Sequence, residues 1–193
     1  VLAVLEELRQ NGVENILALR GDLVPGVPPK TDFRHASDLA AFVREHSGCD
    51  IIGACYPEGH PEAASAEDDI RNLKRKVDAG VSHLISQLFF DNDYFYSFLE
   101  RARAAGVGVP VEAGIMPVTN KRQIERMVSL CGATLPKKFT TMMQKYENNP
   151  DAMRDAGIAY AVDQIVDLAA HDVDGVHLYT MNNAYVAKKI SEA

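Results

Sequence analysis

The sequence predicts an α/β protein, part of a (β/α)8 TIM barrel. Five short apolar runs alternate with segments of helical period, the pattern of parallel strands joined by crossover helices. Each run ends in polar residues or glycine, as barrel strands do where they meet the loops that carry chemistry. No Gly-x-Gly-x-x-Gly follows any run, so an open dinucleotide-binding sheet is the weaker interpretation.

Taken in order, the elements begin with a helical pattern at residues 1–8, and strands and helices then alternate. The predicted strands start at Asn15, Asp50, His83, Pro110 and Asp174. The predicted helices cover residues 36–46, 65–79, 94–105 and 152–170.

The chain is short for a closed barrel. Eight strands need about 250 residues, whereas this sequence has 193 and shows five strands. It also begins without Met, inside a helical pattern that has no N-cap. We therefore expect a single partial barrel domain over residues 1–193, holding about the last five βα units and lacking the N-terminal ones.

The composition is that of a globular domain, and its charge argues against some classes of binding partner. Hydrophobic residues make up 47% and charged residues 24%, enough for one sizeable core. The net charge of −7 comes without a basic block, which argues against nucleic acid or an anionic membrane as partner. No membrane-spanning run or secretory signal is visible, and the three cysteines lack C-x-x-C spacing, so we expect a cytoplasmic protein with reduced thiols.

Two loops follow predicted strands. Residues 23–32 hold three prolines and one glycine, which exclude a helix or a central strand, and the position suits a loop that covers a ligand. Tyr56-Pro57-Glu58-Gly59-His60-Pro61-Glu62 gathers an aromatic ring, two carboxylates and a histidine. One histidine is weak evidence for a metal, so a ligand-contacting loop is the better interpretation, with a plain surface loop as the alternative.

The helix predicted at residues 65–79 starts with capping-box spacing and ends before Gly80. Asp69, Asn72 and Lys76 fall at i, i+3 and i+7 and share one face, with Arg75 beside it. That face could bind a ribose hydroxyl and a diphosphate. An outer face of solvated ion pairs fits the same spacing, and local pattern alone leaves both interpretations open.

Two polar residues interrupt apolar strands. Gln87 lies in the run L-I-S-Q-L-F-F, and Glu112 lies in V-E-A. A buried amide without partners costs about 1–3 kcal/mol, so Gln87 is expected to meet either a substrate in the barrel interior or neighbouring backbone groups. Glu112 raises the same question.

Six motifs, in order, resemble those of methylenetetrahydrofolate reductases, and together they cover nearly the whole chain. They are L-R-G-D at 19–22, Y-P-E-G-H-P-E at 56–62, N-L-K-R-K-V-D-A-G at 72–80, Q-L-F-F-D at 87–91, G-I-M-P-V at 114–118 and Y-T-M-N at 179–182.

The resemblance implies a barrel enzyme that uses FAD to reduce 5,10-methylenetetrahydrofolate to 5-methyltetrahydrofolate. It implies a ping-pong scheme in which a hydride passes through the flavin, with NAD(P)H as the electron donor. The carboxylate of Asp22 would lie beside the flavin ring and disfavour the anionic reduced form.

The resemblance also assigns roles by motif. Asp22 and Gln87 would be catalytic, and Gln87 and Met127 would bind the folate. The cofactor would contact Arg20, Gly21, Asp22, His35, Ala36, Tyr56, His60, Asp69, Asn72, Arg75 and Lys76, and no metal is implied. This resemblance favours the ligand-binding interpretation of the helix at 65–79.

Three departures from the family pattern bear on function. The family's general acid, a glutamate on the first strand, would lie before Val1, so the chain alone is expected to be inactive. Met127 stands where the family often has an aromatic residue, which puts its contact in question. Residue 183 is asparagine, where bacterial members of the family commonly carry arginine, which leaves room for a partner subunit that delivers electrons. Barrels of this family often associate, so a homo-oligomer is expected.

Two other classes of function remain open. A truncated paralogue, or non-catalytic subunit, would bind flavin or folate without catalysis, and would lack the glutamate on the first strand. A phosphate-binding barrel aldolase would need a Gly-rich phosphate loop after the last strands, and Gly175 alone does not supply one.

Overall fold

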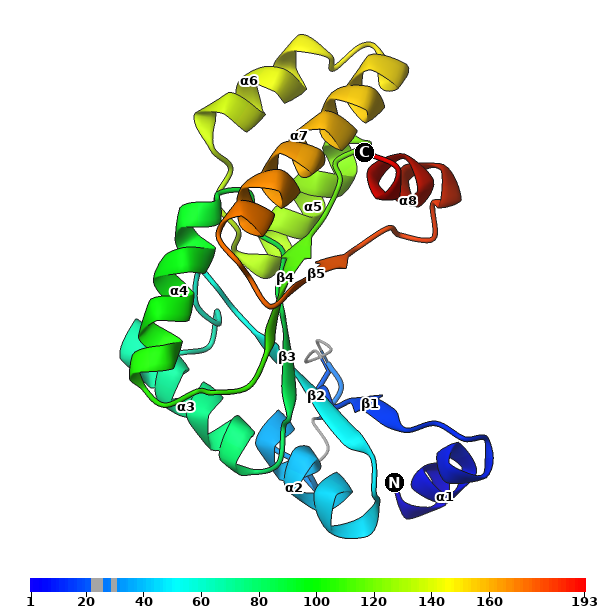
Figure 1. Cartoon of the computed structure of the whole chain (residues 1–193), viewed down its shortest axis with the longest axis vertical. Helices are drawn as coiled ribbons and strands as arrows, with labels where there is room; N and C mark the ends of the chain where they lie inside the picture. The colour runs from blue at the N-terminus through cyan, green and yellow to red at the C-terminus, as the bar shows by residue number, and fades with distance from the viewer. Residues whose placement is uncertain (22–25, 29–30) are drawn as a thin grey trace.

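The fold is a single curled sheet of parallel strands, the arrangement of part of a (β/α) barrel (Figure 1). The computed structural model describes residues 1–21, 26–28 and 31–193, without the side chains of 123, 126 and 130. The strands are β1 (Asn15–Leu17), β2 (Asp50–Cys55), β3 (His83–Ser86), β4 (Val111–Ile115) and β5 (Gly175–Leu178). They lie side by side in chain order, and each pairs in parallel with the next, which confirms the predicted fold class.

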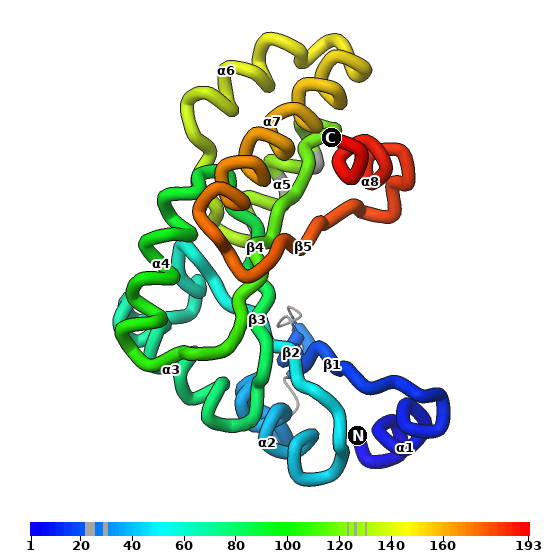
Figure 2. The backbone as a smooth tube through the Cα atoms, viewed as in Figure 1, coloured from blue at the N-terminus to red at the C-terminus, as the bar shows by residue number. Residues whose placement is uncertain are grey.

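Helices alternate with the strands, and those that connect strands lie on one face of the sheet. The helices are α1 (Leu2–Gln10), α2 (Ala36–His46), α3 (Ala66–Asp78), α4 (Asn92–Ala104), α5 (Lys121–Cys131), α6 (Lys137–Lys145), α7 (Pro150–Ala170) and α8 (Ala184–Ser191). The predicted helices agree with α1, α2, α3, α4 and α7 to within two residues at either end. Sequence periodicity did not predict α6 or α8. In Figure 2, α1 and α8 lie beyond the two edge strands, β1 and β5.

The two faces of the sheet differ in burial. Alternate residues of the strands point toward the helices, and there Leu84, Val111 and Ile115 are completely buried. The residues between them point to the inner face of the curl, where Leu17 and Leu19 remain 48% and 49% exposed. The main core therefore lies between the sheet and the helices.

Helix α3 has the boundaries that its sequence predicts. The hydroxyl of Ser65 accepts a hydrogen bond from the Asp68 amide at 3.2 Å, as an N-cap does. At the other end Gly80 has a φ of 126°, and an added Cβ there would lie 2.5 Å from the Arg44 side chain. Glycine is thus required both by conformation and by space.

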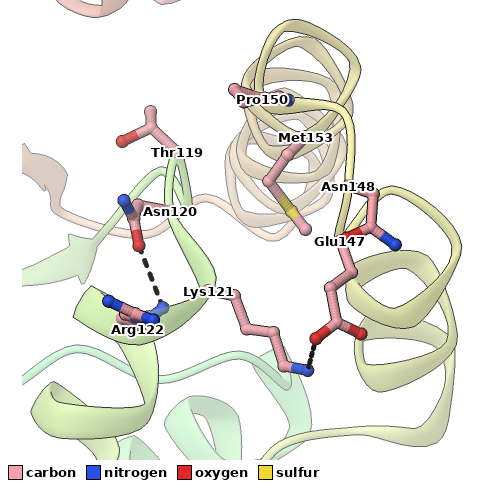
Figure 3. A pocket seen from close by; sticks show the side chains of 8 residues that line it. All are labelled: Thr119, Asn120, Lys121, Arg122, Glu147, Asn148, Pro150 and Met153. Atoms are coloured by element: carbon pink, nitrogen blue, oxygen red, sulfur yellow. Dashed lines mark hydrogen bonds and ion pairs between the residues drawn. The ribbon is translucent and has the colours of Figure 1, made fainter.

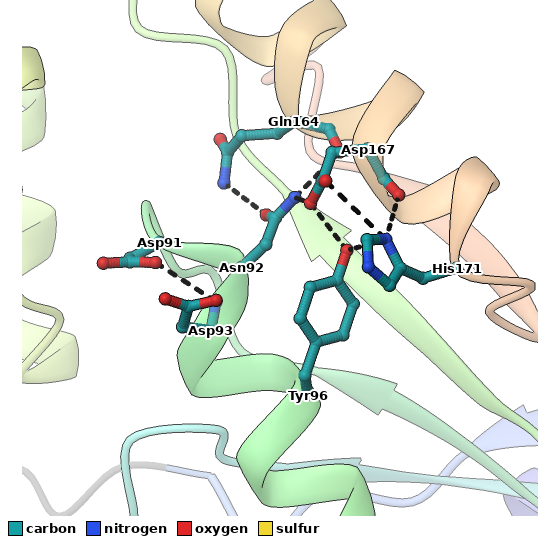
Figure 4. A network of polar contacts seen from close by, with 7 residues as sticks. All are labelled: Asp91, Asn92, Asp93, Tyr96, Gln164, Asp167 and His171. Atoms are coloured by element: carbon teal, nitrogen blue, oxygen red, sulfur yellow. Dashed lines mark hydrogen bonds and ion pairs between the residues drawn. The ribbon is translucent and has the colours of Figure 1, made fainter.

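A polar network joins α4 to α7 (Figure 4). Tyr96 donates a hydrogen bond to Asp167 at 2.6 Å, and Asn92 donates to the same carboxylate at 2.7 Å. These bonds hold the pKa of Asp167 below its usual value. The His171 ring lies against Tyr96 with centroids 4.5 Å apart. The network fixes the long helix α7 against α4.

Candidate active site at the strand ends

The carboxyl ends of the parallel strands bring predicted site residues to one edge of the sheet. Arg20 and Gly21 follow β1, Tyr56 follows β2 and Gln87 follows β3. In parallel β/α proteins this is the edge where ligands bind. Asp22 lies outside the described residues, as do parts of the predicted loop at 23–32.

Arg20 is bound to the loop after β2 by a two-pronged ion pair. Its Nη1 and Nη2 donate to the two carboxylate oxygens of Glu62 at 2.7 and 2.8 Å. The hydrogen bond from Arg20 lowers the pKa of Glu62. Sequence reasoning placed both residues at the site but did not predict their pairing, because neither spacing nor pattern links two separate loops. The pair joins the end of β1 to the loop at 56–62.

The loop at 56–62 is held to its surroundings at several points. The rings of Tyr56 and His60 meet edge to face with centroids 4.5 Å apart. The amide of Glu62 donates to Nδ1 of His60 at 3.1 Å, and the amide of His60 donates to Asp69 on α3 at 3.3 Å. Because an amide can only donate, Nδ1 of His60 is an acceptor, so a neutral ring carries its proton on Nε2.

A further contact of this loop reaches the segment before α6. Both carboxylate oxygens of Glu58 accept from the Thr134 amide, at 3.1 and 3.0 Å. Glu58 was part of a motif singled out in the sequence, but its partner lies 76 residues away and no local signal indicates it.

Helix α3 carries four predicted cofactor residues, and they divide into two pairs. Asp69 and Lys76 are partly buried, and Lys76 donates to the Ala54 carbonyl at 2.6 Å. Burial raises the pKa of Asp69 and lowers that of Lys76. Asn72 and Arg75 are exposed, and Arg75 donates to the Asn72 amide oxygen at 3.1 Å. The helix thus offers a carboxylate and an ammonium near the strand ends, with a guanidinium outside.

His35 and Ala36 lie at the start of α2. His35 is the residue before the helix, and its amide donates to the Asp38 carboxylate at 2.9 Å. His35 therefore occupies the N-cap position of α2.

Gln87 presents one side of its amide group. Its side-chain Oε1 accepts from the backbone N–H of Leu88 at 2.9 Å. The backbone N–H of Gln87 donates to the Cys55 carbonyl at 2.7 Å. Since the Leu88 N–H must face an oxygen, the Nε2 end points away from this contact. Within the described part of the chain no group accepts from Gln87 Nε2. Neighbouring backbone therefore satisfies only half of the amide.

Met127 lies on α5 and packs at the border of a second apolar cluster, which includes Leu88, Phe90 and Met116. Tyr179, after β5, borders the same cluster. The structure therefore brings Met127 to the apolar region that begins directly after Gln87.

A separate pocket of about 420 Å³ opens at the start of α5 (Figure 3). Across it, Lys121 donates to Glu147 at 2.7 Å. The residues that line it are Thr119, Asn120, Lys121, Arg122, Glu147, Asn148, Pro150 and Met153. None of the site residues predicted from the sequence lines this pocket.

Two features of the described residues bear on the class of site. No three His, Cys, Asp or Glu side chains in that part of the chain are grouped so as to hold a metal ion. No helix there combines the length and the apolar composition that a membrane span requires.

A curled parallel sheet with helices on its outer side, and with charged and amide groups at the strand ends, defines a protein of the (β/α)-barrel class. The solved structure of an uncharacterized protein from Clostridium thermocellum shares this fold, with a TM-score of 0.58 and 14% identity over 80% of this chain and 56% of that one. That protein is described as binding two copies of 5-methyl-5,6,7,8-tetrahydrofolic acid.

The chain belongs to the methylenetetrahydrofolate reductase family, whose model matches residues 1–193. It is 36% identical to the 5,10-methylenetetrahydrofolate reductase of Pectobacterium carotovorum subsp. carotovorum over 97% of this chain and 62% of that one. The enzyme of the same name from Escherichia coli K12 is 38% identical over 93% of this chain and 60% of that one. The chain thus spans about three fifths of the length of these bacterial relatives.

Proposed function

We propose that this chain forms the FAD- and folate-contacting part of an enzyme that reduces 5,10-methylenetetrahydrofolate to 5-methyltetrahydrofolate. The observation that carries the proposal is the set of side chains at the strand ends, in a chain that matches the reductase family over its whole length. Donors and acceptors on Arg20, His60 and Gln87 gather where this class of barrel binds its ligands.

The hydrogen-bonding groups that follow β1 and β2 and lie on α3 suit the polar parts of FAD. Asp69 supplies a carboxylate for ribose or ribityl hydroxyls, and Lys76 and Arg75 supply cations for a diphosphate. The remaining proposed cofactor contacts are Arg20, Gly21, the carboxylate of Asp22, His35, Ala36, Tyr56, His60 and Asn72. Bound there, FAD would supply hydride transfer in two half-reactions, a ping-pong scheme.

The chain's own residues prepare the site for the substrate. The Arg20–Glu62 pair fixes the end of β1 against the loop at 56–62. Gln87 keeps its Oε1 on the Leu88 amide and offers its Nε2 to an acceptor atom of the pterin. Met127 supplies apolar surface beside it. Gln87 is therefore a donor toward the folate.

The source of electrons has two candidates, NAD(P)H and a partner subunit. Among the relatives, an Arabidopsis thaliana protein is named methylenetetrahydrofolate reductase (NADH) 1 and is 36% identical over 92% of this chain and 33% of that one. Asn183 favours testing the partner subunit as well, because the family resemblance implies a cation at this position and asparagine does not supply one. A homo-oligomer in the cytoplasm is part of the same proposal.

Cofactor binding is the first test of this function. The natural protein, purified with whatever segments flank residues 1–193, is expected to show flavin absorption bands or to regain them on incubation with FAD. Arg75→Ala and Lys76→Met are each expected to reduce the FAD content, whereas Lys138→Ala, a change on α6, is expected to leave it unchanged. A colourless protein that cannot be reconstituted would contradict the proposal.

A further inference from the structure

Tyr179 makes a hydrogen bond that crosses an entire strand. It follows β5, where its amide donates to Ile115 of the neighbouring β4 at 2.9 Å. Its phenol donates to the carbonyl of Ser86, at the end of β3, at 2.9 Å. Because β4 lies between β3 and β5, the side chain spans β4 to reach this acceptor.

The crossing depends on Gly114 in β4. A Cβ added there would lie 2.8 Å from Cε2 of Tyr179 and 2.2 Å from the Ser86 carbonyl oxygen. Both distances are well inside van der Waals contact, and the second involves backbone that cannot move aside. Glycine at this position therefore provides the room in which the Tyr179 ring lies.

The acceptor of this bond is the residue directly before Gln87. Ser86 is completely buried, and its hydroxyl accepts from the Gly114 amide at 2.8 Å and donates to the Gln87 carbonyl at 3.0 Å. The Ser86–Gln87 peptide is thus held at its carbonyl by Tyr179 and at its N–H by Cys55. The Gln87 carbonyl is held by the Ser86 hydroxyl, which Gly114 of β4 holds in turn. Ser86, Gly114 and Tyr179 therefore link β3, β4 and the end of β5 directly next to Gln87.

The Tyr179 ring is itself held in place. The His177 ring meets it edge to face with centroids 4.7 Å apart, and Nδ1 of His177 lies 3.8 Å from a carboxylate oxygen of Glu112. Burial raises the pKa of Tyr179 to about 12, so the phenol keeps its proton and remains a donor at neutral pH.

We propose that Tyr179 is a positioning residue that fixes the Gln87 amide for the substrate through the Ser86 carbonyl. The inference rests on the proposed function, because it assumes that Gln87 contacts the folate. Removing the phenol hydroxyl would leave the Ser86–Gln87 peptide held only by the bond from the Gln87 backbone N–H to Cys55. The carbonyl side of this peptide would be loosened, and Gln87 would then present its Nε2 in more than one direction.

The test compares two tyrosines that each donate to a backbone carbonyl in the same stretch of chain. Tyr160 on α7 donates to the Phe90 carbonyl at 2.6 Å, and burial likewise raises its pKa to about 12. Tyr179→Phe and Tyr160→Phe therefore remove the same chemical group. The measurements are FAD content, the midpoint of thermal unfolding, and the dissociation constant of 5-methyltetrahydrofolate from its anaerobic bleaching of the flavin.

Tyr179→Phe is expected to weaken folate binding about fivefold to tenfold, with FAD content unchanged. Tyr160→Phe is expected to shift the unfolding midpoint without changing folate binding. In a Gln87→Ala background, Tyr179→Phe is expected to have no further effect, because the two residues act through one contact.

Three results would overturn the inference. Equal effects of the two tyrosine substitutions on folate binding would show that Tyr179 has only a structural role. Additive effects of Tyr179→Phe and Gln87→Ala would show that Tyr179 acts independently of Gln87. A wild-type flavoprotein that is not bleached by the folate would refute the proposed function, and the inference with it.

Discussion

Side chains at the strand ends are held by other loops or by neighbouring backbone, and this decides what they can offer a ligand. Gln87 is the clearest case, because the Leu88 amide fixes its Oε1 and leaves Nε2 as the donor. The sequence identified Gln87 from its apolar surroundings, but it left open whether backbone or substrate would satisfy the amide. The structure shows that backbone satisfies the oxygen alone.

Gln87→Glu tests the direction of this hydrogen bond. The carboxylate can still accept from Leu88, so the local fold should persist, but the donor to the pterin is lost. We expect the dissociation constant of 5-methyltetrahydrofolate to rise about 10- to 100-fold, which corresponds to about 1–3 kcal/mol for an unsatisfied partner. Unchanged folate binding, with the unfolding midpoint also unchanged, would show that Gln87 Nε2 does not meet the substrate.

Asp69→Asn is expected to stabilise the protein while weakening FAD binding. Burial raises the pKa of Asp69 in the folded state. Folding therefore costs more free energy as the pH rises from the pKa of the unfolded state to that of the folded state. Asparagine removes this cost and can still accept from the His60 amide. We expect the unfolding midpoint without FAD to rise by about 1–2 °C at pH 7, and by progressively less as the pH is lowered toward the ordinary aspartate pKa of about 4.

The FAD content of the Asp69→Asn protein should fall at the same time, because a neutral amide is a weaker acceptor for hydroxyl groups. A lower unfolding midpoint at pH 7 would show that the ionised carboxylate stabilises the fold. An unchanged FAD content would remove Asp69 from the cofactor site.

At the scale of elements, the apolar periodicity and the capping signals are enough to predict the strands and five of the helices. Ser65 and Gly80 bound α3 as expected, because both effects are local. Helix α8 was missed although Asn183 caps it by accepting from the Val186 amide, since this stretch was interpreted only through its family motif. Contacts between loops, such as Glu58 with Thr134, depend on the tertiary fold and leave no local pattern.

The packing of α3 on β2 depends on Gly53, which faces the stem of Lys76. A Cβ there would lie 3.0 Å from Val81 and 3.1 Å from Cδ of Lys76. We expect Gly53→Ala to lower the free energy of unfolding by about 1–3 kcal/mol, because the added carbon overpacks this interface. It should also reduce FAD content by displacing the Lys76 ammonium from the Ala54 carbonyl.

Gly48→Ala is the matched control, since an added Cβ at Gly48 meets no atom within 4 Å. We expect this change to alter the free energy of unfolding by no more than about 0.5 kcal/mol. Chemical denaturation of both variants measures the difference. Similar effects of the two substitutions would contradict the packing argument for Gly53.

At the scale of the molecule, the parallel order β1 to β5 places chemistry from distant parts of the chain at one edge. Arg20 and Glu62 are 42 residues apart, and Ser86 and Tyr179 are 93 apart, yet each pair is in direct contact. The (β/α) alternation predicted the common edge. It did not predict which side chains meet there, because that depends on register, on the loops and on glycines such as Gly114.

The central claim is that this chain provides the flavin and folate sites of a methylenetetrahydrofolate reductase. Anaerobic addition of 5-methyltetrahydrofolate to the natural protein carrying FAD tests it most directly, because the folate half-reaction then runs in reverse. We predict that the flavin absorption bands bleach in proportion to the folate added, and that Gln87→Glu weakens this response. A protein that binds FAD normally but keeps its full absorption at saturating folate would contradict the claim.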